Sequence, residues 1–361
     1  MINESRLVQT FLDLVAIDSP SGQEQAIADD LVKRFAALGG EVVRDEHHNL
    51  IARFPNDRSD WLMLSAHMDT VGTDVGIKPQ IRDGIIFSDG TTILGGDDKS
   101  GVAVILEILQ SLQEDGAAHP PLEAVISVSE EVGLQGARWL DKGQIRSRSG
   151  VILDGGGSLS NIVVSAPSQD TLRVTVYGRK AHAGAEPEKG INAIRVASEA
   201  IAAMPLGRID EETTANIGVI QGGTATNIVP DEVFIRGEAR SRNAEKLAKQ
   251  TAAMVAAFED AAERNGARVE VKIQRSYNSY TLTEATPIVA KTMAAIQKLG
   301  QTPVLKASGG GTDGNIYAEH GIYCCVLSTG MSQVHTTNEN IAISAMMACA
   351  RLLQDIVANS E

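Results

Sequence analysis

The sequence predicts a protein of the α/β class in which a main domain, residues 1–168 and 281–361, is interrupted by a smaller α+β domain at residues 169–280. Two observations support this prediction. In the main domain, short apolar runs alternate with helical periodicity, as in parallel sheets buried on both faces. From about Thr171, apolar and polar residues instead alternate one by one, which indicates strands with one solvated face. A length of 361 residues is compatible with two domains.

The first part of the chain alternates helices and strands. Apolar residues recur at helical spacing before Gly39 and Gly40, and again after Lys99. The segments expected to form helices are 7–15, 27–38 and 99–112, and those expected to form strands are 42–43, 50–54, 61–66, 123–129 and 150–153. Adjacent His47 and His48 would point to opposite faces of a strand and could not easily chelate one ion, so we expect a solvated turn there.

The smaller domain is expected to have the β-α-β-β-α-β order of a ferredoxin-like fold. Leu172, Val174 and Val176 alternate with polar residues, and so do Val233 and Ile235. A helical stretch follows each of these strands, at 192–204 and at 243–264. Helical periodicity then resumes at about residue 283. A strand at 321–327 and a last helix from residue 341 complete the main domain.

Three of the buried strands end in polar residues suited to a metal site. His67, the pair Glu130 and Glu131, and Asp154 each follow an apolar run, and Asp97 opens the next helix. In open α/β sheets, ligands bind beyond the carboxyl ends of the strands. Imidazole and carboxylate together suit Zn²⁺ and tolerate Mn²⁺ or Co²⁺.

Each of these residues, taken alone, also has an ordinary structural explanation. Asp97 or Asp98 could cap a helix or interact with its dipole, the two glutamates could end a solvated strand, and a turn could use Asp154. The coincidence at three strand ends favours a single site over scattered acids.

Charge and composition exclude several classes of function. A net charge of −14 argues against a nucleic-acid partner and against an anionic membrane surface, because both need a basic protein surface. No apolar run approaches membrane-spanning length, and no basic segment followed by an apolar one suggests export. Cys324, Cys325 and Cys349 form no disulfide framework and are expected to be buried free thiols. We therefore expect a cytoplasmic protein.

Six motifs, in order, resemble those of the M20 family of dinuclear zinc peptidases. They are HxD at 67–69, GDDKxG at 96–101, SEExG at 129–133, Asp154, KAHAG at 180–184 and HTxxExI at 335–341. The segment TILGGDDKSG and the short chain look most similar to the peptidase T (tripeptidase) branch. The resemblance covers essentially the whole chain. It implies a three-layer α/β/α catalytic domain of the zinc-peptidase type, with the inserted domain serving as a lid or for dimerisation.

The resemblance also implies roles for the residues at the strand ends. His67 and Asp154 would bind one metal ion, Glu131 and His335 the other, and Asp97 would bridge the two; Zn²⁺ is expected, with Mn²⁺ or Co²⁺ as alternatives. Glu130 matches the catalytic base, and Asp69 matches the carboxylate that orients His67. In this scheme two cations activate water and polarise the scissile carbonyl, while Glu130 transfers the proton.

Substrate contacts are implied at four further positions. His182 matches a donor to the oxyanion, supplied by domain closure or by a partner subunit, although the sequence alone is equally consistent with an exposed turn histidine. Asn227 and Arg240 resemble substrate contacts; Arg240 could clamp a carboxylate or could be a solvated edge-strand residue. Gly310 lies in the glycine-rich segment 309–314, which carries no phosphate-binding GK[ST] and is expected to allow the backbone to approach substrate.

Glu339 completes the last motif, but it could simply favour the N-terminus of the last helix.

The expected function is hydrolysis of a peptide bond in short peptides, of the aminopeptidase or tripeptidase type. An N-acyl-amino-acid amidohydrolase would use the same residues on another substrate. A non-catalytic metal-binding scaffold is the third possibility, but it would be expected to lack a ligand or Glu130, and every such position is occupied. Either domain closure or a homodimer through the inserted domain is also expected, because His182 is far in sequence from the metal ligands.

Overall fold

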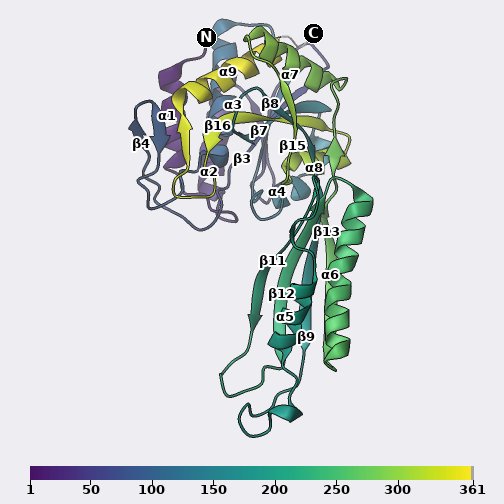
Figure 1. The fold of residues 1–361 in the computed structure, drawn as a ribbon. Helices are drawn as coiled ribbons and strands as arrows, with labels where there is room; N and C mark the ends of the chain where they lie inside the picture. The colour runs from purple at the N-terminus through teal and green to yellow at the C-terminus, as the bar shows by residue number, and fades with distance from the viewer. Residues whose placement is uncertain (359–361) are drawn as a thin grey trace. The chain divides into compact units, whose positions relative to one another are not determined.

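The computed structural model describes residues 1–358, which form two compact units (Figure 1). Unit 1 comprises Met1–Ser165, Thr281–Ser308 and the described residues from Thr312 onward. Unit 2 comprises Ala166–Tyr280 together with Gly309–Gly311. The chain is therefore of the expected α/β class, with a second unit inserted into the first.

Unit 1 is built on a mixed sheet in which four neighbouring strands, β6, β3, β7 and β16, run parallel. The sheet continues beyond them in the order β1-β2 on one side and β17-β5-β4 on the other, and β8 carries β14 and β15 away from this path. The strands are β1 Glu41–Arg44, β2 Leu50–Phe54, β3 Leu62–His67, β4 Gln80–Arg82, β5 Ile85–Phe87, β6 Leu122–Ser127, β7 Ser149–Gly156, β8 Asn161–Ala166, β14 Tyr280–Thr281, β15 Val304–Ala307, β16 Tyr323–Ser332 and β17 Asn340–Ala342.

Helices cover this sheet because their apolar stripes and the apolar strands bury each other. Helices α1, α3 and α9 pack together; α3 contacts β3 and β7, and α9 contacts β16. Every residue of β3 and β6 is buried, which explains why their sequences read as continuous apolar runs. The helices are α1 Glu4–Val15, α2 Gln25–Ala37, α3 Gly96–Asp115, α4 Gln135–Trp139, α7 Pro287–Lys298, α8 Asp313–Glu319 and α9 Ile343–Ala358, with a 3₁₀ turn at Lys142–Gln144.

Unit 2 is an antiparallel sheet in the order β10-β11-β12-β9-β13, with two helices that pack on it and on each other. Its long strands have the strand order of the ferredoxin-like fold expected from the sequence. Inward-facing Leu172, Val174 and Val176 of β9 join the apolar residues of α5 and α6 in one core. The elements are β9 Ser168–Tyr177, a 3₁₀ turn at Pro187–Lys189, α5 Ala193–Ala203, β10 Gly207–Arg208, β11 Thr213–Gly222, β12 Glu232–Ser241, α6 Ala244–Arg264 and β13 Arg268–Tyr277.

The three cysteines and the adjacent histidines His47 and His48 all lie in unit 1. Cys324, Cys325 and Cys349 are buried and free, as expected. His47 and His48 lie in a turn but are half-buried rather than fully solvated, since His47 stacks on Trp139 and Nδ1 of His48 lies against the Arg44 guanidinium. Among residues 1–358, no helix has the length and apolar character needed to cross a membrane.

Candidate metal centre

Parallel strands bring several of the predicted ligands to one edge of the unit 1 sheet. β3 ends at His67, β7 carries Asp154 near its end, and the chain reaches Glu130 and Glu131 shortly after β6. Because these three strands are parallel, their carboxyl ends meet at the same edge. Asp97 is added from the first turn of α3.

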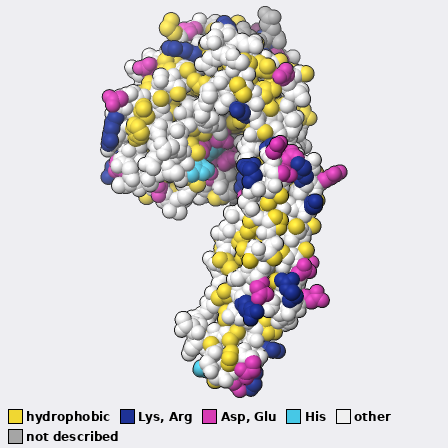
Figure 2. Space-filling model, viewed as in Figure 1, with side chains coloured by type: hydrophobic (Ala, Val, Ile, Leu, Met, Phe, Trp, Pro, Cys, Tyr) yellow, Lys and Arg dark blue, Asp and Glu magenta, His cyan; other side chains and the backbone are white. Residues whose placement is uncertain are grey.

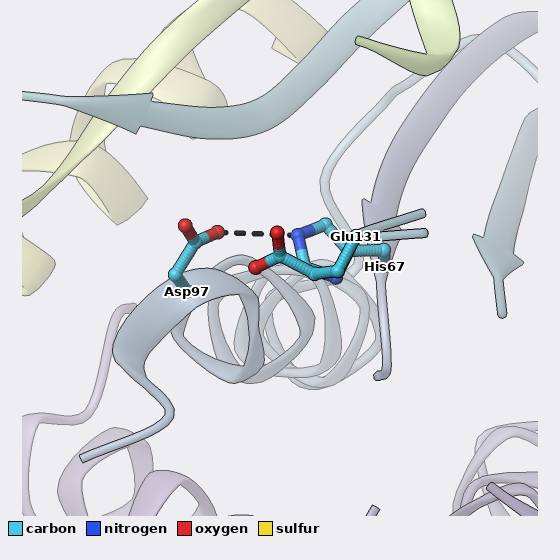
Figure 3. Close-up of side chains that lie close together, drawn as sticks. All are labelled: His67, Asp97 and Glu131. Atoms are coloured by element: carbon cyan, nitrogen blue, oxygen red, sulfur yellow. Dashed lines mark hydrogen bonds and ion pairs between the residues drawn. The ribbon is translucent and has the colours of Figure 1, made fainter. Parts of the chain in front are cut away.

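The first group of side chains is centred on His67. Its Nε2 atom lies 3.1 Å from Oδ1 of Asp97 and 3.7 Å from Oδ1 of Asp154. The His67 side chain is only 2 % exposed, so these carboxylates lie close to it in a largely dry environment. Figure 3 shows Asp97, at the start of α3, facing His67 with Glu131 beside them.

The second group shares Asp97 with the first. Oδ2 of Asp97 lies 3.2 Å from Nε2 of His335, and the same nitrogen lies 2.9 Å from Oε1 of Glu131. The two oxygens of Asp97 therefore face two different histidines. His335 comes from the segment after β16 and has a left-handed backbone, with φ at 63°. Ligand atoms of His67, Asp97 and Glu131 all lie within 4.8 Å of one another.

The neighbouring Asp98 is turned mainly towards the backbone. Its Oδ2 accepts a hydrogen bond from the His67 amide, and its Oδ1 accepts one from the Gly101 amide, both at 3.2 Å. An oxygen of Asp98 nevertheless lies within 4.8 Å of ligand atoms of His67 and Asp154. Of the two adjacent aspartates, Asp97 is the one whose two oxygens lie close to His67 and to His335.

Hydrogen bonding of the His67 ring indicates that this arrangement fits a metal ion. Nδ1 lies 3.0 Å from the carbonyl oxygen of Asp69, which can only accept a hydrogen bond, so Nδ1 carries a proton. In the neutral ring, Nε2 then has a bare lone pair facing the oxygens of Asp97 and Asp154. Such lone pairs repel unless a proton or a cation lies between them. Oε1 of Glu131 is also buried, and it accepts no hydrogen bond although Nε2 of His335 lies 2.9 Å away.

The pKa values of the group reflect the same crowding of acids. Burial alone would lower the pKa of the His67 imidazole, but the carboxylates of Asp154, Asp69 and Asp97 together raise it well above its usual value. Asp97 and Glu131 raise the pKa of His335 to about 10. Burial raises the pKa of Asp154 to about 7. The site therefore binds protons strongly, and a divalent cation could replace them.

Asp69 has two sets of contacts. Its carboxylate lies 3.4 Å from Nδ1 of His67, although its backbone carbonyl lies closer. The carboxylate oxygens accept hydrogen bonds from the amides of Glu130, at 3.0 Å, and Glu131, at 3.3 Å, and from the Ser21 hydroxyl. Asp69 therefore holds the turn that carries both glutamates as well as contacting His67.

Glu130 lies among the same acids. Burial, together with the nearby Asp154, raises the pKa of Glu130 well above the usual value of a glutamate. A carboxylate in this position has a raised affinity for a proton, which suits a group that takes a proton from water.

Four predicted substrate contacts lie in unit 2. Nδ1 of His182 accepts hydrogen bonds from the amides of Gly184 and Ala185, each at 3.1 Å, so the neutral ring carries its proton on Nε2. The backbone carbonyl of Asn227 accepts a hydrogen bond from the backbone amide of Ala183, which places Asn227 beside the segment that carries His182. Arg240 makes a two-pronged contact with Glu238, at 2.9 and 3.0 Å. Gly310 belongs to the short segment Gly309–Gly311.

No motif in the sequence indicated the buried carboxylates of Glu24 and Asp313 near the centre. Glu24 accepts hydrogen bonds from the amide and hydroxyl of Ser129, and a hydroxyl hydrogen bond links Ser127 to Asp313, whose pKa is raised to about 6 by burial. Glu339 does not act at the N-terminus of the last helix, which begins at Ile343. Its oxygens instead accept the amides of Leu94, Gly95 and Asp97, at 2.8, 2.8 and 3.0 Å. Glu24, Asp313 and Glu339 lie far in sequence from these groups that they bind, so no fixed spacing marks these contacts.

The surface of unit 1 agrees with this placement. In Figure 2, acidic side chains gather in a hollow of unit 1, with a histidine beside them. Such a hollow lined with carboxylates attracts cations.

Comparison with known proteins identifies the family. Peptidase family M20/M25/M40 matches residues 63–359, so the chain belongs to this family. The structure is similar to that of the aminopeptidase PepT from Bacillus cereus, with 44 % identity, coverage of 99 % of this chain and 98 % of that one, and a TM-score of 0.88. It is also similar to a tripeptidase from Staphylococcus aureus, with 39 % identity, coverage of 99 % and 98 %, and a TM-score of 0.94.

A curated relative from Bacillus subtilis, described as "Uncharacterized protein YqjE", is 44 % identical over 366 residues, covering 99 % of both chains. These matches confirm the family resemblance seen in the motifs, its peptidase T branch and the expectation of a hydrolytic peptidase.

Proposed function

We propose that this protein is a metal-dependent peptidase that removes the N-terminal residue from short peptides, tripeptides above all. The observation that carries the proposal is the position of the Asp97 carboxylate, whose Oδ1 faces Nε2 of His67 and whose Oδ2 faces Nε2 of His335. The similar proteins described as an aminopeptidase and a tripeptidase support this class of substrate.

Two divalent cations fit the donor atoms of this site. We assign His67, Asp97 and Asp154 to one ion and Asp97, Glu131 and His335 to the other. Nitrogen and oxygen donors favour Zn²⁺, with Mn²⁺ and Co²⁺ as alternatives. When bound, such ions lower the pKa of water and polarise the scissile carbonyl.

Proton transfer is assigned to Glu130. Its carboxylate would take the proton of the attacking water and return it to the leaving amine, since burial favours its protonated form. Asp69 fixes the backbone of Glu130 and also contacts His67, so it positions the base and the ligand together.

Substrate contacts are assigned to unit 2. The proton on Nε2 of His182 would be donated to the oxyanion that develops on the scissile carbonyl. Asn227, Arg240 and Gly310 are proposed to contact the peptide. The Arg240 guanidinium, held from one side by Glu238, would bind the substrate carboxylate with its remaining N–H groups. Closure or dimerisation through unit 2, and a cytoplasmic location, stay predictions.

The experiment is a substrate panel with the metal-loaded protein. Tripeptides, dipeptides and N-acetyl amino acids would be compared at equal concentration, with products resolved by mass spectrometry. Release of the first residue from tripeptides, at a higher kcat/KM than for the other two classes, is the expected result. Preferential hydrolysis of N-acetyl amino acids would replace the peptidase by an amidohydrolase on the same site.

A further inference from the structure

The turn that carries Glu130 and Glu131 begins in an unfavourable backbone conformation. Ser129, directly before Glu130, has φ at 51°, in the left-handed region that non-glycine residues rarely adopt. Such a conformation persists only where surrounding contacts determine it. The contacts at Ser129 therefore decide where the two glutamates point.

Two buried carboxylates hold three consecutive amides of this turn. Asp69 accepts the amides of Glu130 and Glu131, and Glu24 accepts the amide of Ser129 at 3.0 Å. The same Oε1 atom of Glu24 accepts the Ser129 hydroxyl at 2.9 Å and the Gly22 amide at 2.9 Å. Glu24 is only 3 % exposed, so water does not compete with these bonds.

We propose that Glu24 is a positioning residue for the reaction. By holding the amide and the hydroxyl of Ser129, it keeps this residue left-handed and thereby directs Glu130 towards the substrate and Glu131 towards His335. The inference rests on the proposed roles of Glu130 and Glu131, and it assigns no contact between Glu24 and the substrate or a metal ion.

A single oxygen, Oε1, accepts these three hydrogen bonds of Glu24, so the charge of the carboxylate is not needed for them. Glu24→Gln can place its amide oxygen at the Oε1 position and keep every bond. Glu24→Met has a similar length but accepts none of them. Comparison of the two variants separates a positioning role from an effect of charge.

The expected result for Glu24→Met is a fall in kcat of about 10²-fold, the scale of an ångström-sized misplacement of a catalytic group. KM should change little, because unit 2 contacts are untouched, and the metal content should fall by up to one ion per chain as Glu131 loses its direction. Glu24→Gln should restore kcat to within about threefold, since its hydrogen bonds remain.

Glu123 provides a control at the other end of β6, although it also forms an ion pair with Arg53. It is also a buried glutamate, and its Oε2 accepts the amide and the hydroxyl of Ser147, at 3.1 and 2.9 Å. Glu123→Met should lower thermal stability but leave kcat per folded molecule unchanged. An equal fall in kcat for Glu123→Met would mean that the effect is general loss of stability.

Other outcomes also decide the question. A Glu24→Met variant with unchanged kcat, or a Glu24→Gln variant as impaired as Glu24→Met, would overturn the positioning role. If Glu24→Met does not fold, Ser129→Ala removes only the hydroxyl bond and should still lower kcat at constant KM; full kcat there would contradict the proposal. The activity of Glu130→Gln is measured alongside. An active Glu130→Gln variant would show that the proposed base is wrong. An inactive Glu130→Gln together with a fully active Glu24→Met would reject only the positioning role of Glu24.

Discussion

Replacement of Asp97 by asparagine is expected to weaken both halves of the metal centre at once. Oδ1 lies 3.1 Å from His67 Nε2, and Oδ2 lies 3.2 Å from His335 Nε2, so one carboxylate serves both groups. Asparagine keeps the shape but removes the charge. It also turns an N–H group towards one of the two imidazole lone pairs, which satisfies that nitrogen without a cation.

The size of the effect follows from the lost charge. Two unit charges 4 Å apart interact by about 4 kcal/mol at an effective dielectric constant of about 20. The interaction with a divalent cation is about twice as large, so a loss of at least this size is expected for each ion, which corresponds to at least about 10³-fold weaker binding. Asp97→Asn should therefore hold less than one ion per chain after dialysis and hydrolyse peptides at a correspondingly low rate.

Asp98→Asn is the matched control, because Asp98 is the adjacent residue and accepts the amides of His67 and Gly101. This variant should lose about 1–3 kcal/mol of stability through the disturbed amide bonds, and it should retain more metal than Asp97→Asn. Metal content would be measured by elemental mass spectrometry, affinity by chelator competition, and folding by circular dichroism. If Asp98→Asn loses both ions while Asp97→Asn keeps them, the assignment of the bridging residue is wrong.

Three other perturbations test separate parts of the account. Glu130→Gln should keep its metal and lose about 10²–10⁴-fold in kcat, the usual contribution of a general base; normal turnover would remove Glu130 from this role. Metal binding should release protons, because neighbouring carboxylates raise the pKa of His67 well above its usual value and that of His335 to about 10, and a metal ion would displace the protons held there. The affinity for the metal should thus increase as pH rises towards the pKa of His335. Calorimetry in buffers of different ionisation enthalpy would measure the number of protons released on metal binding. A value of zero would refute this expectation. Arg6→Ala should lower the free energy of unfolding by about 3 kcal/mol, because it leaves the fully buried Glu107 carboxylate without its cation; an unchanged urea midpoint would contradict that.

Much of the fold could be predicted because burial shows directly in the sequence. The continuous apolar runs of β3 and β6 reflect burial on both faces, and the alternation in β9 reflects a half-buried sheet. Strands β4, β5 and β17 were missed. Each has three residues, too few for periodicity to be visible, and β5 joins the sheet by pairing with the distant β17.

The metal centre likewise contains residues that the sequence indicates and residues that it does not. His67, Asp97 and Glu131 follow from motifs, because the chemistry requires those residue types beside a strand end or a helix start. Glu24 and Glu339 act on backbone amides 105 and 245 residues away, at Ser129 and Leu94. The HTxxExI motif contains Glu339, but only the folded chain shows which amides Glu24 and Glu339 hold, and no spacing in the sequence could indicate those contacts.

The most direct test of the central claim is an anomalous diffraction map at the zinc edge from crystals of the protein grown with Zn²⁺. We expect two peaks beside the Asp97 carboxylate, one contacting His67 and Asp154 and the other contacting Glu131 and His335. A map with no peak at Asp97, or with zinc bound only elsewhere on the chain, would contradict it.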